Sequence, residues 1–165
     1  MYRMVQMKPR VVEGRARTSA SPQETFAILA DAERWPDWSL QDEASLEREG
    51  APARDGVGAI RRFRTGRVTV HEEVMEFEPP RRFVYELRSG LALKGYRSEV
   101  TLTPIAGEAG EAGTGTDIHW RSQFRAKVPG SGPLYQWKLG QIIQRSADLL
   151  AAEANRQAAA ETPVK

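Results

Sequence analysis

A glutamate in a predicted strand is the group in this sequence best placed for acid–base chemistry. Glu72 alternates with Val70 and Val74, so it shares their side of the strand, which we expect to face the interior. Burial disfavours a carboxylate and raises its pKa, so Glu72 could act as a general acid or base. Arg61 or Arg62 in the preceding strand could instead pair with it in a structural ion pair. The sequence leaves both interpretations open.

Hydroxyl groups are predicted on the same interior side. Tyr85, Tyr96 and Ser122 could each orient a carbonyl or hydroxyl group of a ligand, or satisfy a neighbouring polar group. With the apolar residues around them they form one set, which we expect either to line an apolar pocket or to pack as plain core. The set is Phe26, Phe83, Tyr85, Leu87, Tyr96, Val100, Trp120, Ser122, Phe124, Tyr135, Leu139, Ile142 and Ile143.

The sequence gives little support for metal or nucleophile chemistry. His71 and His119 are the only histidines, both fall on the predicted outer side of their strands, and there is no cysteine. These residues do not supply the converging ligands that a metal site needs. Ser21 is explained by helix capping, and no Gly-x-Ser-x-Gly motif is present. We therefore expect no metal and no cofactor.

A helix is predicted early in the chain. Ser21 stands directly before Pro22, with Glu24 three residues after it. These are an N-cap serine, a proline at the first helical position and the glutamate of a capping box, so the helix should begin at Pro22. Trp35 precedes a proline, which disfavours further helix there. We expect an aromatic corner at this point, where the chain turns toward a sheet.

Alternation and helical spacing predict the other elements. The segment 116–127 has the clearest period of two. From Leu134 onward apolar residues recur at helical spacing, which predicts a long amphipathic helix. Gly140 in that helix costs about 1 kcal/mol relative to alanine, so we expect another element to approach closely there. The predicted strands are 10–20, 41–49, 59–65, 67–78, 82–88, 95–103 and 116–127.

The motifs and their order resemble the SRPBCC superfamily, which includes START-type, birch-pollen-allergen-type and polyketide cyclase/dehydrase and lipid-transport-like proteins. The resemblance covers roughly residues 10–155. It implies an α+β helix-grip fold, a curved antiparallel sheet wrapped around a long C-terminal helix, with one or two short helices after the first strand and a cavity between sheet and helix. The motifs that carry it are S-P-x-E-x-F from Ser21, W-P-x-W from Trp35, G-V-G-A at 56–59, E-F-E-P-P-R-R-F-V-Y at 76–85 and V-T-L-T-P at 100–104.

Length and composition predict one domain of ordinary soluble character. We expect residues 1–9 to be disordered or extended, 10–155 to form the domain and 156–165 to be a frayed tail. The net charge is only +2, and the arginines stand near glutamates, which favours cross-strand ion pairs over nucleic-acid binding. No apolar run suits a signal peptide or membrane span. We expect a cytoplasmic protein without integral membrane association, and the sequence is compatible with a homodimer.

The function that we favour is binding of a hydrophobic or aromatic small molecule, lipid- or polyketide-like, in the cavity between sheet and helix. One alternative is a polyketide cyclase/aromatase-like enzyme that uses the same cavity, with Glu72 as the candidate catalytic group. The other is a co-chaperone-like interaction module that acts through its outer surface. A large cavity would favour the first two, and a filled core would favour the third.

Overall fold

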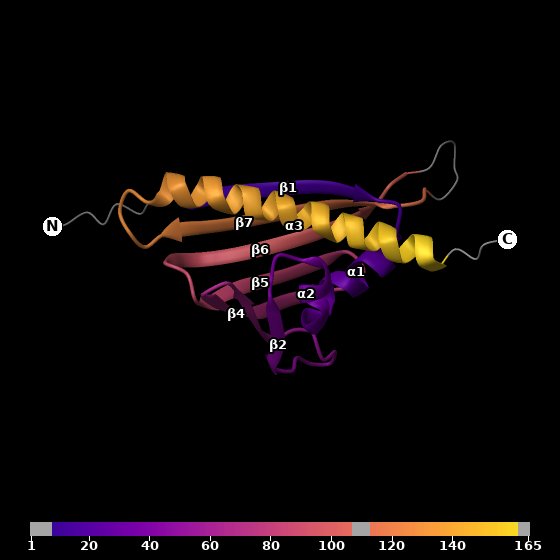
Figure 1. The fold of residues 1–165 in the computed structure, drawn as a ribbon, viewed down its shortest axis with the longest axis horizontal. Helices are drawn as coiled ribbons and strands as arrows, with labels where there is room; N and C mark the ends of the chain where they lie inside the picture. Colours follow the sequence, from indigo (N-terminus) through magenta and orange to yellow (C-terminus); the bar gives the residue numbers. More distant parts are fainter. Residues whose placement is uncertain (1–7, 107–112, 162–165) are drawn as a thin grey trace.

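The structure, a computed structural model, describes residues 8–106 and 113–161, and it confirms the predicted α+β helix-grip fold (Figure 1). Seven antiparallel strands form one sheet in the order β1-β7-β6-β5-β4-β3-β2. The elements are β1 (Arg10–Thr18), α1 (Pro22–Ala30), the 3-10 helix η1 (Ala32–Arg34), α2 (Trp35–Trp38), β2 (Glu43–Arg48), β3 (Ile60–Thr65), β4 (Val68–Glu78), β5 (Arg82–Ser89), β6 (Leu93–Pro104), β7 (Thr116–Ala126) and α3 (Gly132–Glu161).

The predicted start of α1 is confirmed. The Ser21 hydroxyl accepts a hydrogen bond from the backbone N–H of Glu24 at 3.2 Å, and the Glu24 carboxylate accepts one from the backbone N–H of Ser21 at 2.7 Å. This reciprocal capping box satisfies two N–H groups that have no partner within the helix. It fixes where the chain leaves β1 and enters the helical layer.

The expectation that helix stops before the proline after Trp35 is wrong. Trp35 has helical angles, φ −56° and ψ −38°, and begins the short helix α2. Proline is tolerated in the first turn of a helix because its missing N–H would have had no partner there. The Trp35 indole also donates to the carbonyl of Leu29 at 2.9 Å and stacks on Phe63. These contacts hold Trp35 in the conformation that its proline neighbour disfavours.

Helix α3 lies along β1 and β7 (Figure 1). Amide side chains on α3 form hydrogen bonds with β1. Gln144 accepts from the backbone N–H of Arg15 at 3.1 Å and donates to the carbonyl of Arg15 at 2.9 Å. Gln136 donates to the carbonyl of Val11 at 3.3 Å, and Asn155 accepts from the Thr18 hydroxyl at 2.8 Å. An edge strand with unpaired backbone groups is a template for aggregation, so these contacts both seat the helix and protect the edge.

The close approach of two backbones occurs at Gly14 and not at Gly140, which corrects the sequence prediction. A Cβ atom at Gly14 would lie 2.7 Å from the carbonyl oxygen of Ile143 and 2.8 Å from the Cα of Gln144. A Cβ atom at Gly140 would meet only the Val12 side chain, at an ordinary 3.8 Å. The strand therefore supplies the glycine that lets the helix come close.

The segment 156–161, expected to fray, is helical, and α3 ends at Glu161. Arg156 forms two hydrogen bonds to Glu153, at 2.6 and 2.8 Å, and Ala158 packs against the core. Contact with α1 and the alanine-rich sequence explain the extra turns. The expectations for 1–7, 107–112 and 162–165 fall outside the described residues. No described helix combines the length and apolar character that a membrane span requires.

Substitutions at the two glycines test this docking. Gly14→Ala should lower the free energy of unfolding by about 1–3 kcal/mol, because the new methyl group meets the helix backbone. Gly140→Ala should raise it by up to about 1 kcal/mol, because alanine favours the helix and space exists for it. Urea denaturation of both variants measures the two effects. A neutral Gly14→Ala variant would contradict the close packing of α3 on β1.

Candidate functional site

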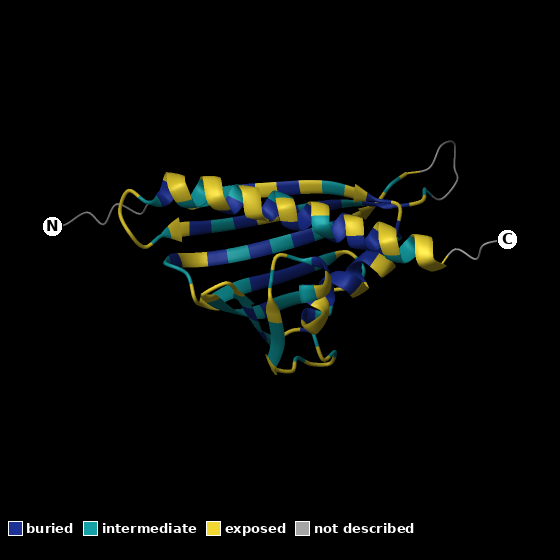
Figure 2. Ribbon diagram, viewed as in Figure 1, coloured by how far each residue is buried: buried dark blue, intermediate teal, exposed yellow. Residues whose placement is uncertain are grey.

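Most members of the predicted interior set are buried, as the sequence predicts. Figure 2 shows that buried and less buried positions alternate along the central strands. Leu87 and Tyr135 are half-buried, and Ile142 is 45% exposed. The buried stripe of α3 is centred on residues such as Leu139 and Ile143, and a rotation of 100° per residue puts Ile142 at its margin. The expectation that Ile142 faces the interior is therefore wrong. The buried members are Phe26, Phe83, Tyr85, Tyr96, Val100, Trp120, Ser122, Phe124, Leu139 and Ile143.

A buried ion pair crosses two neighbouring strands in this interior. Arg61 of β3 is opposite Glu72 of β4 in the sheet register, and its Nη2 donates to the Glu72 Oε2 at 2.8 Å. The Arg61 side chain is fully buried, and that of Glu72 is 12% exposed. The inward orientation of Glu72 is confirmed. Its partner is Arg61, whereas Arg62 points the other way and lies 3.9 Å from Glu43.

Four aromatic rings surround the Arg61 guanidinium. Its Cζ lies 4.8 Å from the ring centres of Trp35 and Tyr85, 4.9 Å from Phe83 and 5.1 Å from Phe63. Cation–π attraction stabilises a guanidinium in such a cage, the more so away from water. Two of its nitrogens, Nε and Nη1, have no hydrogen-bond acceptor among the described residues. Buried N–H groups are normally paired, so this arginine has donor capacity left for an acceptor that the described chain does not provide.

The hydroxyl groups nearby form a short network. The Ser98 hydroxyl donates to the Tyr96 oxygen at 3.1 Å, and Tyr96 donates to Ser122 at 3.4 Å. Ser98 and Ser122 are also hydrogen-bonded to each other. The Trp120 indole donates to the Tyr85 oxygen at 3.2 Å. Sequence reasoning did not single out Ser98 as a site residue. Its inward position in β6, two residues after Tyr96, was the available signal.

Burial dominates the acid–base properties of the interior. Loss of hydration raises the pKa of Glu72, and the attraction of Arg61 offsets this only in part. Burial also raises the pKa of Tyr85 well above its ordinary value and raises that of Tyr96. A carboxyl group with a raised pKa can take up and release protons nearer neutral pH than an ordinary glutamate can. The acid–base interpretation of Glu72 therefore stays open beside the structural one.

The outer face of the sheet carries ion pairs and both histidines. His71 contacts Ser89 at 3.0 Å and Glu47 at 3.2 Å, and His119 lies 3.3 Å from Glu13. In the ranges 8–106 and 113–161, no group of three or more histidine or acidic residues could hold a metal ion. Cross-strand pairs also form as expected, with Arg97 of β6 bound to carboxylates of β4 and β5 at 2.6 and 3.0 Å.

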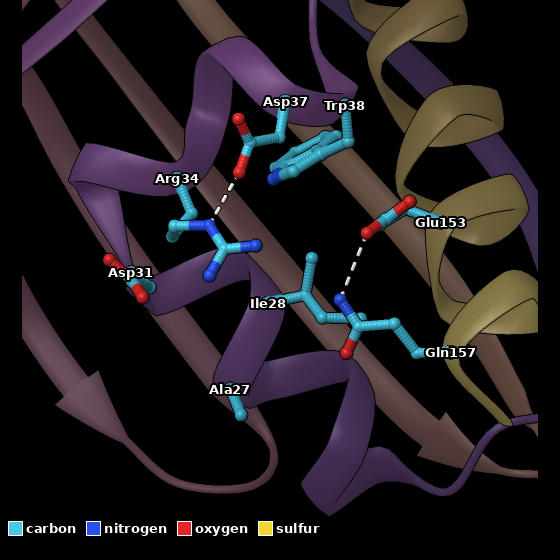
Figure 3. Close-up of a pocket in the computed structure, with 8 residues that line it drawn as sticks. All are labelled: Ala27, Ile28, Asp31, Arg34, Asp37, Trp38, Glu153 and Gln157. Carbon is cyan, nitrogen blue, oxygen red and sulfur yellow. Dashed lines mark hydrogen bonds and ion pairs between the residues drawn. The ribbon is translucent and has the colours of Figure 1, made fainter. Parts of the chain in front are cut away.

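Two pockets lie outside the predicted set. One, of about 220 Å³, is a half-open hollow lined by residues of α1, η1, α2 and the C-terminal part of α3 (Figure 3). The other, of about 650 Å³, is an open depression over β1, β7 and β6. Neither is lined by a residue that we predicted to contact a ligand. Around Arg61 the predicted aromatic residues instead pack on one another, with Phe26 and Phe83 at 6.1 Å and Phe83 and Tyr85 at 6.2 Å. Neither pocket is therefore the cavity expected between the sheet and the helix, and that cavity stays a prediction.

Solved structures with this fold include proteins of several bacteria. A START superfamily protein from Mycobacterium smegmatis is 14% identical, with a TM-score of 0.75 over 89% of this chain and 98% of that one. The Zhui aromatase/cyclase from Streptomyces sp. R1128 is 16% identical, with a TM-score of 0.74 over 95% and 100%. A protein from Thermus thermophilus is 17% identical, with a TM-score of 0.67 over 93% and 100%. At these identities the likeness shows the fold.

The antiparallel sheet and the long helix packed along it define the helix-grip fold. Residues 9–155 match the family described as polyketide cyclase/dehydrase and lipid transport, and the chain belongs to that family. A search of curated proteins found no match.

The raised pKa of Glu72 predicts a pH-dependent stability. Below pH about 4.5 the carboxyl group is protonated in both the folded and the unfolded chain. As the pH rises through the folded-state pKa, the folded protein must give up a proton that it holds more tightly, so its free energy of unfolding falls. Glu72→Gln should remove this part of the pH dependence. Urea denaturation of both proteins between pH 4 and 8 measures the difference.

The comparison with Glu72→Gln is necessary because other carboxylates act in the opposite direction. A hydrogen bond with Ser21 lowers the pKa of Glu24, and a hydrogen bond with Arg82 lowers that of Glu99. The contributions of these two residues to the free energy of unfolding are therefore lost on acidification. An NMR titration of the Glu72 carboxyl carbon provides the direct check. A midpoint below the ordinary glutamate range would mean that the attraction of Arg61 outweighs burial.

Proposed function

We propose that the protein binds a hydrophobic or aromatic small molecule that carries a carbonyl or phenolic oxygen, and that this oxygen accepts hydrogen bonds from Arg61. The proposal rests on the fully buried guanidinium of Arg61, whose Nε and Nη1 have no hydrogen-bond acceptor among the described residues. A charge-assisted hydrogen bond from such a group is stronger than a neutral one, and the dry interior strengthens it further. Membership of a polyketide cyclase and lipid-transport family supports an interior ligand in general.

The surroundings of Arg61 suit a planar ligand. Trp35 and Phe63 are stacked at 4.8 Å, which is the contact that an inserted aromatic ring would replace or extend. Glu72 holds one end of the guanidinium through Nη2 and leaves the Nε and Nη1 groups available. The rings around Arg61 pack on one another, so the proposal rests on the hydrogen-bonding capacity of Arg61 and not on a preformed cavity. A ligand that separated these rings would meet an apolar, aromatic wall and one fixed donor, the usual composition of a small-molecule site.

The ligand would enter along the flank of α3 that does not touch β1. Gln136 and Gln144 bind the β1 backbone, which fixes that flank of the helix. The other flank of α3 carries three apolar residues spaced seven apart, Tyr135, Ile142 and Leu149. They lie nearly opposite the two glutamines, because each residue of a helix adds a rotation of 100°. Two of them are half-buried and Ile142 is exposed. This partly covered margin needs the least repacking to open.

A matched pair of probes tests the role of Arg61. α-Tetralone, a ketone, should bind the wild-type protein about tenfold or more tightly than tetralin, which lacks the oxygen, because a hydrogen bond to a charged group contributes about 1.5–3 kcal/mol. The double variant Arg61→Met/Glu72→Gln should bind both equally. Removing both partners avoids a buried unpaired charge and favours a folded variant. Isothermal titration gives the affinities.

Arg62→Met is the control, because it makes the same substitution at the neighbouring arginine that points outward. It should keep the preference for the ketone. If the double variant kept the preference too, or if the wild-type protein bound tetralin as tightly as tetralone, Arg61 would not be the ligand donor.

A second candidate function is a cyclase-type enzyme, favoured by the raised pKa of Glu72 beside Arg61. The Glu72 carboxylate would take a proton from a methylene carbon between two carbonyl groups, and Arg61 would stabilise the enolate oxygen that forms. Attack of that carbon on another carbonyl of the same chain closes a ring and leaves an alkoxide, which takes the proton back from Glu72. The resulting hydroxyl group then leaves as water with a second proton from the same methylene carbon, which completes the condensation.

The enzyme is distinguished from the binder by turnover of a soluble poly-β-ketone surrogate, followed by the absorbance of the aromatic product. An enzyme should lose about 100-fold or more in rate in Glu72→Gln, with affinity changed by only a few fold. Glu73→Gln is the control, because Glu73 pairs with Arg48 and Arg88 on the other side of the sheet. If the wild-type protein has no turnover, the binding function stands alone.

A cytoplasmic location and a homodimer stay predictions.

A further inference from the structure

A second polar pocket lies beside the interior site, among the helices, where Trp38 packs on Trp35. It is the pocket of about 220 Å³ shown in Figure 3. Side chains from the segment that runs from α1 through η1 to α2 form one side, and the C-terminal part of α3 forms the other. The polar lining residues are Asp31, Arg34, Asp37, Glu153 and Gln157, and the apolar ones are Ala27, Ile28 and Trp38.

Trp38 has an unused hydrogen-bond donor at this pocket. Its side chain is 7% exposed, and its indole Nε1 has no acceptor among the described residues. The indoles of Trp35 and Trp120, which are also buried, donate to Leu29 and Tyr85. Figure 3 shows the Trp38 nitrogen at the end of the ring that is turned toward Arg34. A buried N–H group is normally satisfied, so this one points to an acceptor on a bound molecule.

The charges around the pocket narrow the chemistry of that molecule. Asp37 accepts from the Nε of Arg34 at 2.5 Å, and Glu153 accepts from Arg156 and from Gln157, the latter at 2.9 Å (Figure 3). With Asp31, three carboxylates line the pocket, and pairing of Asp37 with Arg34 and of Glu153 with Arg156 leaves one net negative charge. An anion would be repelled by these carboxylates. A simple cation would offer no acceptor to Trp38, since ammonium and guanidinium groups only donate.

We propose that this pocket binds a small neutral carboxamide attached to an apolar or aromatic group. The amide oxygen accepts from the Trp38 indole and from Arg34, whose side chain is 65% exposed and can move to admit it. The amide N–H groups donate to Asp31, whose side chain makes no capping hydrogen bond to the following helix. The apolar part lies against Ala27 and Ile28. The pocket adjoins the interior site, because the Trp38 ring contacts the Trp35 ring at 5.0 Å, but its ligand would meet none of the residues proposed for the interior ligand.

Three probes of one shape and different charge test the proposal: benzamide, benzoate and benzamidine. Each is titrated into the full-length ¹⁵N-labelled protein, and the indole N–H signals of its four tryptophans are followed. Benzamide should shift the Trp38 signal saturably with a millimolar dissociation constant, the range expected for so small a ligand. The Trp120 signal, which reports on the interior, should stay in place. The charged probes should bind at least about fivefold more weakly.

Tighter binding of either charged probe would overturn the assignment of a neutral amide. Absence of saturable binding, or a shift of Trp120 without Trp38, would overturn the site itself. The latter result would leave the interior function untouched, so the two proposals fail separately.

Variants complete the test by isothermal titration with benzamide. Trp38→Phe keeps a ring and removes the N–H group, so affinity should fall about fivefold, the effect of one neutral hydrogen bond. Ala27→Phe fills the pocket from an exposed position of α1 and should abolish binding. Gln23→Phe, one turn earlier on the same helix and outside the pocket lining, should leave binding unchanged. Equal affinity in Ala27→Phe and Gln23→Phe would overturn the proposal even if Trp38→Phe failed to fold.

Discussion

The buried ion pair between Arg61 and Glu72 is the interaction around which the interior is arranged. Two charged groups can leave water together only if they neutralise each other and if the surroundings compensate the rest of the guanidinium. The sheet register meets the first condition by placing them opposite each other on β3 and β4. Four aromatic rings from β3, β5 and α2 meet the second. The position of α2 is therefore tied to a charge on the sheet.

Such a pair is a poor way to gain stability, since apolar residues of similar volume often serve as well or better. Arg61 contributes even less to stability, because its Nε and Nη1 groups have no hydrogen-bond acceptor among the described residues. A functional explanation accounts for both features, because a preorganised donor in a dry, aromatic setting is what a ligand oxygen or a developing enolate needs. The same reasoning applies to Trp38. Its indole N–H has no acceptor among the described residues, whereas the indoles of Trp35 and Trp120 each have one.

Helix α3 depends on a different constraint, the close contact of its backbone with β1. Gly14 permits that contact, and the amides of Gln136, Gln144 and Asn155 bind backbone or side-chain groups along the strand. One flank of the helix is thereby anchored, and the opposite flank, with Tyr135 and Ile142, is only partly covered. A helix held along one side leaves the other side as the natural entrance to the interior.

The sequence by itself determined the elements whose signals are local. The capping box at Ser21, the period-two pattern of 116–127 and the inward position of Glu72 follow from contacts or alternation within a few residues, and all three are confirmed. Tertiary structure decided the features that depend on distant partners. Local rules predicted no helix at Trp35 and a close approach at Gly140, but packing on Phe63 and the crossing of α3 over Gly14 set the outcome. The choice of Arg61 over Arg62 as the partner of Glu72, and the donors left unbonded on Arg61 and Trp38, likewise required the folded chain. Periodicity gives the direction of a side chain, whereas only the assembled layers determine which groups it meets and which it lacks.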